Sequence, residues 1–281
     1  MNEKQVAIII LNYNSWRDTQ KEVLLCREKL NVSYEDIIVV DNASPNNSGE
    51  MLREQAGKLG FIMLESQFNN GYASGNNIGL RYAFNNGYKY ALVLNNDIII
   101  DDELLLDKLM AVFQKDKSIA VVNPDIYSPE GYMFNRDARK MSFYYYTIGA
   151  VKYKKIGRIA EDLGGYAIIY RPQGCCMMVD LNKIDEIDYM DENTFLYYEE
   201  VILAERLLKK QYKCALSLES KIIHNHSTTV KSVLDKRQIQ KIANKSFRYY
   251  LSEYRKFNII QINICCMFSN IKSILTELKC K

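Results

Sequence analysis

The chain has 281 residues, of which 48% are hydrophobic and 25% charged, and this length favours one large α/β domain with an appendage over two full domains. The net charge of +3 is unevenly spread, because residues 231–281 carry 11 Lys and Arg against 3 Asp and Glu. Seven cysteines without a Cys-x-x-Cys pair argue against a disulfide framework or a zinc site and predict free thiols in a reducing compartment.

Short β-branched runs alternate with segments of helical periodicity along the first half of the chain. The expected strands cover 6–11, 37–40, 61–64, 91–94 and 119–122, and the expected helices cover 19–30, 49–59, 76–85 and 103–115. Unbroken apolar strands that alternate with helices predict a mostly parallel sheet covered on both faces. Such a sheet binds ligands beyond the carboxyl ends of its strands, so polar residues there are candidates for chemistry.

The second half continues this pattern less regularly. Strands are expected over 167–170, 175–179 and 214–218, with helices over 181–187 and 199–210. No low-complexity linker or internal repeat separates the halves. We therefore expect a single domain over residues 1–230, followed by a basic, amphipathic helical extension over 231–281.

Polar side chains follow three of the expected strands. The first ends at Asn12, the second at Asp41, and the fourth at Asn95, Asn96 and Asp97. A carboxylate at position 41 suits the ribose or base of a nucleotide, with a turn cap as the alternative. Asp97 could hold Mg²⁺ or Mn²⁺ through its hard oxygen ligands while the metal also binds a diphosphate; a simple turn is again the alternative.

A turn of small residues, from Gly71 to Asn77, follows the third strand. Glycines let the backbone approach a ligand closely and a helix follows, as in a phosphate-binding loop. The segment matches neither the Gly-x-Gly-x-x-Gly nor the Walker pattern. A tight strand-to-helix turn is therefore the preferred interpretation.

Residues 191–200 place four carboxylates around a bulky, mostly aromatic run: Asp191, Glu192, Glu199 and Glu200. Burial in a partly apolar pocket raises the pKa of a carboxyl group and makes it a usable general base near neutral pH. A solvated helix N-terminus rich in Glu is the alternative. The two histidines, His224 and His226, could both face one metal or diphosphate, although one ligand and one structural residue is favoured.

Taken in order, these segments resemble glycosyltransferase family 2, the inverting enzymes, rhamnosyltransferases among them, that build bacterial surface polysaccharides. The resemblance spans residues 5–230, and its landmarks are 8–14, 39–44, 69–77, 94–97, 174–177, 191–200 and 224. It implies the GT-A fold, a Rossmann-like, mostly parallel sheet flanked by helices, here with a C-terminal helical extension.

The resemblance also implies a role for each candidate residue. It assigns nucleotide-sugar binding to the amides and the carboxylate at the strand ends, which are Asn12, Asp41, Asn76, Asn77, Asn95 and Asn96. It makes Asp97 and His224 the ligands of Mg²⁺ or Mn²⁺. It makes Glu200 the catalytic base beside its acidic neighbour Glu199, and it puts the acceptor next to Gly174, Asp191 and Glu192.

The chain departs from the family pattern at positions that bear on the acceptor more than on the donor. The usual Asn-Pro-Asp reads Asn-Asn-Asp at 95–97, which keeps the ligand and loses the rigid proline. Glu200 stands where Asp is commoner, which moves the carboxylate one methylene outward. Ile202 stands at a second acidic position of the family.

The resemblance implies inverting transfer from a UDP- or dTDP-sugar to a saccharide acceptor, lipid-linked, in the synthesis of an O-antigen or capsule. A catalytically silent sugar-nucleotide-binding protein is one alternative. A nucleotidyltransferase is another, although residues 12–16 lack the basic, glycine-rich loop expected of that class.

The expected location is the cytoplasm, because no signal peptide is predicted and no apolar run approaches the roughly 20 residues of a membrane span. The basic extension could rest on the inner face of the cell membrane and bring the enzyme to its acceptor. Packing against the core or a homodimer contact is the alternative. No nucleic acid partner is expected.

Overall fold

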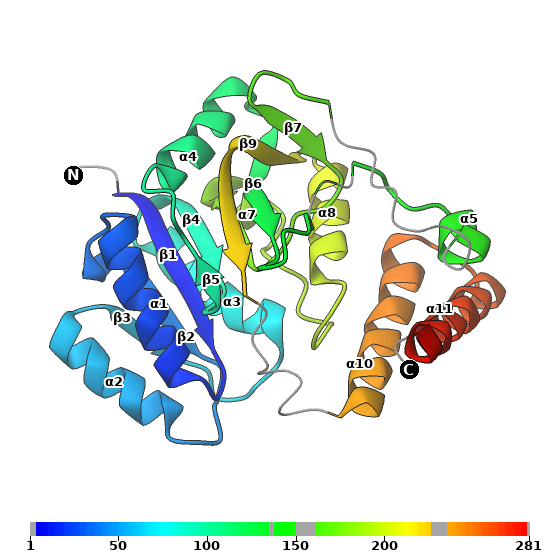
Figure 1. Ribbon diagram of the computed structural model, residues 1–281, viewed down its shortest axis with the longest axis horizontal. Helices are drawn as coiled ribbons and strands as arrows, with labels where there is room; N and C mark the ends of the chain where they lie inside the picture. The colour runs from blue at the N-terminus through cyan, green and yellow to red at the C-terminus, as the bar shows by residue number, and fades with distance from the viewer. Residues whose placement is uncertain (1–3, 135, 137, 150–160, 226–234, 280–281) are drawn as a thin grey trace.

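The computed structural model describes residues 4–134, 136, 138–149, 161–225 and 235–279. In these ranges a mixed sheet of nine strands is flanked by helices on both faces, and three further helical segments lie beside one edge of the body (Figure 1). The strand order is β3-β2-β1-β4-β8-β6-β9-β5, with β7 paired to β9.

The first half of the chain builds the parallel part of the sheet. Its strands are β1 (Lys4–Asn12), β2 (Ile37–Asp41), β3 (Ile62–Glu65) and β4 (Tyr88–Leu94). They are connected through the helices α1 (Trp16–Lys29), α2 (Ser48–Leu59) and α3 (Tyr72–Asn85), with a short 3₁₀ turn, η1 (Tyr34–Asp36), before β2. Parallel strands end at the same edge, so the polar residues after β1, β2 and β4 lie together there.

The strands that follow β4 in the chain run in both directions. The strand β8 (Cys176–Asp180) runs antiparallel to β4 and to β6 (Ile119–Tyr127), and β9 (Lys213–His224) is parallel to β6. Two short strands, β5 (Ile98–Ile99) and β7 (Tyr166–Ile169), pair antiparallel with β9. The helices between β5 and β9 are α4 (Leu105–Lys115), α5 (Phe143–Tyr146), α7 (Leu181–Glu186) and α8 (Glu199–Lys209).

Alternating side chains of the strands fill two separate cores. Ile8 and Ile10 pack with α1, α2 and α4 on one face of the sheet, whereas Ala7 and Ile9 pack with α3, α7 and α8 on the other. Fully burying a side chain of this size stabilises the fold by about 2 kcal/mol. Burial on both faces explains why the strands read as continuous apolar runs.

The C-terminal segment consists of α10 (Lys236–Tyr249), a π-helical turn η2 (Tyr250–Tyr254) and α11 (Ile259–Lys279). Its apolar residues, with Ile202 of α8, form a third core cluster that includes Phe247, Tyr250 and Leu251. This segment therefore packs on the end of the sheet body where α8 begins (Figure 1).

The predicted fold class is confirmed: the sheet is mostly parallel, helices flank it, and a helical extension follows. The details differ where apolar patterning carries little signal, since β5 and α5 were not expected and α3 begins at Tyr72 rather than at position 76. The boundary predicted between 230 and 231 lies outside the described residues, so the division into 1–230 and 231–281 stays a prediction.

Two further expectations can be compared with the described residues. The six cysteines that the structure describes are free and buried, as the sequence predicts. Within the described ranges no helix has the length and hydropathy needed to cross a bilayer.

Candidate active site

The carboxyl ends of β1 and β2 bring Asn12 and Asp41 side by side, because these two residues are paired in the parallel register. The amide of Asn12 donates a hydrogen bond of 2.6 Å to Oδ1 of Asp41. The hydroxyl and backbone N–H of Ser44 donate to the same carboxylate at 2.6 and 3.0 Å. Asp41 is thus a buried carboxylate held in one orientation at the strand end.

A chain of hydrogen bonds extends this arrangement to the end of β4. The hydroxyl of Thr19 donates to Oδ1 of Asn12 at 2.8 Å, and the amide of Asn96 donates to the hydroxyls of Thr19 and Ser15 at 2.8 Å each. Asn96 therefore contacts the first turn of α1, and Asn12 contacts Asp41. In this network the amide of Asn12 orients Asp41, and the amide of Asn96 contacts the hydroxyls of Ser15 and Thr19.

Asp97 and His224 meet at the same edge, since β5 pairs Ile98 with His224. Oδ1 of Asp97 lies 3.2 Å from Nε2 of His224, and both side chains are nearly buried, at 11% and 12% exposure. One carboxylate oxygen and one imidazole nitrogen this close could bind a single divalent cation together, with phosphate oxygens and water as further ligands. Among the described residues no third His, Cys, Asp or Glu joins them, and His226 lies outside those residues.

Glu22 of α1 is a buried carboxyl group that the sequence reasoning missed. Burial, followed by the nearby charge of Asp97, raises the pKa of Glu22 to about 9 against a backbone hydrogen bond from Ile98 that lowers it. A signal was present in the sequence: Thr19, Glu22, Val23 and Cys26 form the buried stripe of α1, so a Glu occupies an apolar helical position.

Glu200 reaches the same edge from α8. The backbone N–H of Gly174 and the amide of Gln173 donate to Oε1 of Glu200 at 3.2 and 3.3 Å. The next residue, Cys175, accepts a hydrogen bond of 2.9 Å from the N–H of Asn95. Burial, then the charges of Glu200 and Asp97, raises the pKa of the Cys175 thiol. Asp97 and Glu200 are therefore both close to the segment 174–175.

Glu199 is the more buried of the two adjacent glutamates. Burial first, and the charge of Glu200 second, raises the pKa of Glu199 to about 8. Its Oε1 has no hydrogen-bond partner among the described residues. The predicted rise in the pKa of a carboxyl group in this segment is thus found at Glu199, whereas Glu200 keeps 20% of its side chain exposed.

The turn at Gly71 is explained by packing. This glycine has φ of 100°, and a Cβ there would lie 2.0 Å from the carbonyl oxygen of Phe195. The N–H of Tyr72 donates to that carbonyl at 3.0 Å, and the Tyr72 hydroxyl donates to the carbonyl of Gly174 at 2.7 Å. The close approach required here is to the backbone of Phe195, which agrees with the tight-turn interpretation.

Asn76 and Asn77 occupy the second turn of α3 and are fully buried. The amide of Asn77 donates to the carbonyl of Met190 and to Glu192 at 2.8 and 2.7 Å, and its oxygen accepts from the N–H of Met190. Asn76 donates to the carbonyl of Tyr72, while its Oδ1 has no partner among the described residues. Asn77 therefore holds the acidic segment, while the unpaired Oδ1 of Asn76 is fully buried.

Asp191 and Glu192 point to opposite sides of their segment. Glu192 accepts from Asn77 and from Arg81 of α3, and these bonds lower its pKa although burial opposes them. Asp191 accepts from the hydroxyls of Tyr249 and Tyr254 in the C-terminal segment. Of the three residues predicted on the acceptor side, Glu192 is tied to α3, Asp191 to the extension, and Gly174 to Glu200 and Tyr72.

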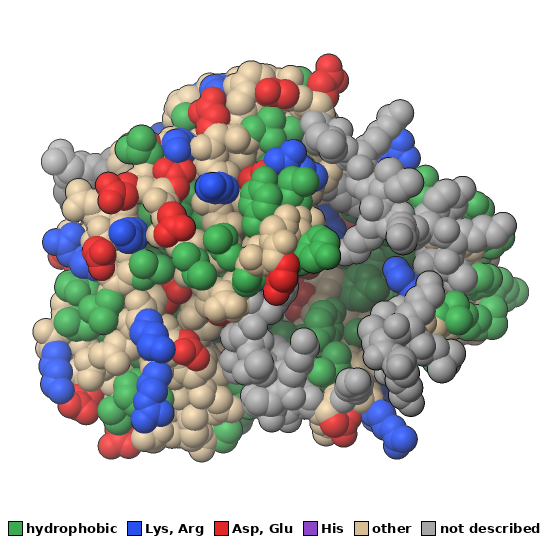
Figure 2. Space-filling model, viewed as in Figure 1, with side chains coloured by type: hydrophobic (Ala, Val, Ile, Leu, Met, Phe, Trp, Pro, Cys, Tyr) green, Lys and Arg blue, Asp and Glu red, His purple; other side chains and the backbone are tan. Residues whose placement is uncertain are grey.

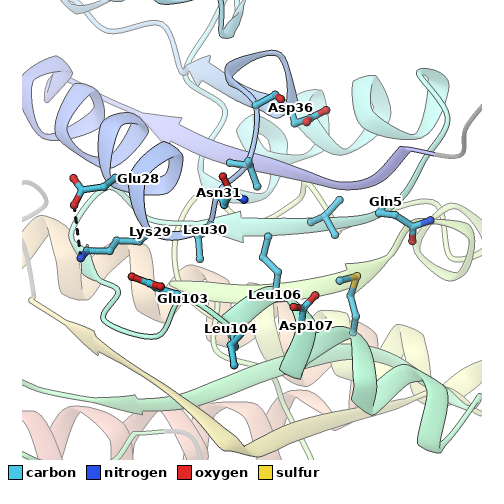
Figure 3. A pocket seen from close by; sticks show the side chains of 14 residues that line it. Gln5, Glu28, Lys29, Leu30, Asn31, Asp36, Glu103, Leu104, Leu106 and Asp107 are labelled. Atoms are coloured by element: carbon cyan, nitrogen blue, oxygen red, sulfur yellow. Dashed lines mark ion pairs between the residues drawn. The ribbon is translucent and has the colours of Figure 1, made fainter.

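A separate cavity of about 820 Å³ lies at the other end of the strands (Figure 3). It is lined by Gln5 at the start of β1, by Glu28 and Lys29 at the end of α1, and by Glu103 and Asp107 around α4. None of the candidate site residues lines it. This cavity is therefore distinct from the candidate active site.

Comparison with known proteins adds independent findings. The family model described as glycosyl transferase family 2 matches residues 7–178. A hexosyltransferase of low-salt glycan biosynthesis, Agl10 of Haloferax volcanii, is 26% identical over 225 residues, which are 78% of this chain and 67% of that protein.

Two solved structures have similar folds. GalNAc-T7, crystallised with UDP, GalNAc and Mn²⁺, matches with a TM-score of 0.65 at 14% identity over 90% of this chain, which spans only 49% of that protein. The mannosyltransferase PcManGT of Pyrobaculum calidifontis, in complex with GDP-Man and Mn²⁺, matches with a TM-score of 0.57 at 12% identity over 97% of this chain and 75% of its own. At these identities the likeness shows the GT-A fold alone.

Proposed function

Because the chain belongs to glycosyl transferase family 2, we propose that it transfers a sugar from a nucleoside diphosphate donor to a saccharide acceptor with inversion at the anomeric carbon. One observation carries this proposal: Asp97 and Glu200 both lie close to the segment 174–175, since Gly174 donates to Glu200, Asn95 donates to Cys175, and the charges of both carboxylates act on the Cys175 thiol. A donor group bound by one carboxylate would thus face a base supplied by the other.

The donor side is built from Asp41 and the network behind it. A carboxylate fixed by Asn12 and Ser44 can accept hydrogen bonds from a ribose diol or a base N–H with little reorganisation. We propose UDP- or dTDP-sugars as donors.

Asp97 and His224 would hold a divalent cation, Mg²⁺ or Mn²⁺, since their facing atoms fit one ion. When bound, such a cation neutralises the charge that develops on the departing diphosphate. The two side chains are nearly buried, so they are already desolvated and oriented. The single carboxylate leaves the remaining positions to phosphate and water, as is usual for Mg²⁺ sites.

Glu200 acts as the general base on the acceptor hydroxyl. The N–H of Gly174 and the amide of Gln173 orient its carboxylate, while Arg171 lies 3.9 Å from its other oxygen. The raised pKa of Glu199, about 8, keeps that neighbour mostly protonated at neutral pH. Glu200, the more exposed of the two, takes the proton as the hydroxyl attacks the anomeric carbon and the nucleoside diphosphate departs.

The acceptor is proposed to be lipid-linked and presented at the inner face of the cell membrane in surface polysaccharide synthesis. Exposed apolar side chains lie along α11, namely Ile259, Ile260, Met267, Ile271, Ile274 and Leu275. Hydrophobic side chains gather at the edge of the molecule where α11 lies (Figure 2). The exposed residues Arg237, Lys241 and Lys245 of α10 add positive charge, which suits an anionic bilayer surface.

The experiment that tests the proposed activity follows release of the nucleoside diphosphate from UDP- and dTDP-sugars in the presence of Mn²⁺, with and without a saccharide acceptor. GDP-mannose serves as the comparison donor. Turnover that depends on an acceptor and inverts the anomeric configuration is expected. Saturable donor binding without any turnover would instead identify a sugar-nucleotide-binding protein.

A further inference from the structure

One face of α8 is committed to the C-terminal segment. Ile202, Glu205 and Lys209 have the spacing of a single helical stripe, and Ile202 belongs to the C-terminal core cluster. Glu205 lies 3.9 Å from Arg255, and its carboxylate accepts a hydrogen bond from the hydroxyl of Tyr170, which also contacts the hydroxyl of Tyr250. Lys209 lies over the ring of Tyr254 at 5.0 Å. The helix α8, which carries the proposed base in its first turn, is therefore packed against the extension through residues along its length.

The segment before α8 is also held from the extension. The hydroxyls of Tyr249 and Tyr254 both donate to Oδ2 of Asp191, the first at 2.8 Å. The hydroxyl of Ser246 donates to the carbonyl of Leu196 at 2.8 Å. The ring of Tyr198 stacks on Phe247 with centroids 5.0 Å apart.

The same segment is held from α3 by different residues. Met190 and Glu192 bond Asn77, and the carbonyl of Phe195 bonds the N–H of Tyr72. Contacts to the donor-side helix and contacts to the extension thus alternate along 190–198. Tyr197 and Tyr198 both have φ of 71°, a left-handed conformation that non-glycine residues hold only when their surroundings impose it.

We infer that the hydroxyls of Tyr249 and Tyr254, acting through Asp191, are positioning groups for the acceptor side of the active site. This inference rests on the proposed function, because it concerns the segment that leads into Glu200. With both hydroxyls in place, the segment 191–198 is fixed on two sides and the first turn of α8 is fixed with it. Without them, the contacts to α3 remain and the donor side is preserved, while Asp191 keeps only Arg206, at 3.9 Å from Oδ2, and its bonds to Asn193, and the acceptor side loses part of its support from the extension.

The test is the double variant Tyr249→Phe/Tyr254→Phe in the full chain, which removes both hydroxyls and keeps both rings. The matched control is Tyr212→Phe, because the Tyr212 hydroxyl donates to Glu186 at 2.8 Å beyond the far end of α8. We expect the double variant to raise the acceptor KM and lower kcat, together at least tenfold in kcat/KM. Binding of UDP, dTDP and GDP with Mn²⁺ and acceptor-free donor hydrolysis should change less than twofold.

A second readout does not depend on turnover. Hydrogen exchange of the amides over 191–200 should be at least tenfold faster in the double variant, with α3 unchanged, and Tyr249→Phe alone should give an intermediate rate. Unchanged exchange over 191–200, or equal losses of donor binding and acceptor use, would overturn the inference. A wild-type protein that turns over no donor would overturn the proposed function and leave the exchange result to be judged by itself.

Discussion

The backbone N–H of Gly174 donates a hydrogen bond of 3.2 Å to the carboxylate of Glu200. Gly174 directly precedes Cys175, whose carbonyl accepts from Asn95 at the end of β4. The proposed base is thus connected, through the backbone of residues 174 and 175, to the strand end that carries Asp97, although the two carboxylates are far apart in sequence. Because the connection runs through the backbone, the side chains of Glu200 and Asp97 can be replaced one at a time to test the acceptor side and the metal side separately.

The first prediction concerns Glu200→Gln. This change keeps the shape of the side chain and its contact with Gly174 but removes the proton acceptor, so kcat should fall by about 10²- to 10⁴-fold. Donor affinity, measured by calorimetry with Mn²⁺ present, should stay within twofold. The exposed Glu219→Gln serves as the control, and a wild-type rate in Glu200→Gln would assign the base to another residue.

The second prediction concerns Asp97→Asn. Replacing the carboxylate by an amide removes a charged oxygen ligand 3.2 Å from His224, so Mn²⁺ affinity should fall about 10- to 100-fold. Electron paramagnetic resonance of free Mn²⁺ measures this directly in a titration with UDP present. The exposed Asp101→Asn is the control, and equal Mn²⁺ affinity in both variants would contradict the assignment.

The third prediction concerns the pH dependence of stability. The pKa of Glu199 is about 8 in the folded protein against 4.5 for an ordinary Glu, so its contribution to stability is fully present below pH 4.5 and is lost as pH rises through 8. The glutamine side chain of the Glu199→Gln variant stays neutral at every pH. The free energy of unfolding of the wild type, relative to Glu199→Gln, should therefore fall between pH 5 and pH 9.

Urea unfolding at the two pH values measures this difference, with at least about 1 kcal/mol expected. Comparing two pH values cancels any constant cost of burying the new amide. A difference that is flat with pH would mean that Glu199 ionises normally in the folded chain.

The sequence predicts most of the strands, because strands such as β1, β2 and β4 are continuous apolar runs that end in polar residues. Asn12 and Asp41 could both be identified from these ends, and their pairing follows from the parallel register. The hydrogen bond from Thr19 to Asn12 could not be identified, because Thr19 lies in a helix whose rotation about its axis depends on packing. The apolar pattern of the strands therefore locates the edge of the sheet where the site lies, but it does not predict which amide side chains donate hydrogen bonds to which carboxylates.

The acidic segment 191–200 shows more clearly which contacts cannot be predicted from the sequence. Asp191 was predicted on the acceptor side, yet its carboxylate binds tyrosines that lie 58 and 63 residues later in the chain. Contacts of such sequence separation leave no periodic signal. The left-handed conformation of Tyr197 and Tyr198 is equally invisible, since aromatic residues have no intrinsic preference for it.

The last prediction concerns the exposed face of α11 and the basic residues of α10. The full chain should float with vesicles that contain phosphatidylglycerol and should bind pure phosphatidylcholine vesicles at least tenfold more weakly. Ile271→Ser/Ile274→Ser removes exposed apolar area, and Lys241→Gln/Lys245→Gln removes two positive charges, each worth about 1 kcal/mol near an anionic surface. Both variants should therefore bind at least fivefold more weakly.

The matched control is Leu24→Ser/Leu208→Ser, which removes exposed apolar side chains from α1 and α8 in the main body of the molecule. Its vesicle binding should equal that of the wild type, because the proposed contact involves only the extension. Equal binding by all variants would contradict the membrane role of α10 and α11. A dimer in analytical ultracentrifugation that dissociates in Ile271→Ser/Ile274→Ser would instead assign the apolar face of α11 to a contact between two copies of the chain.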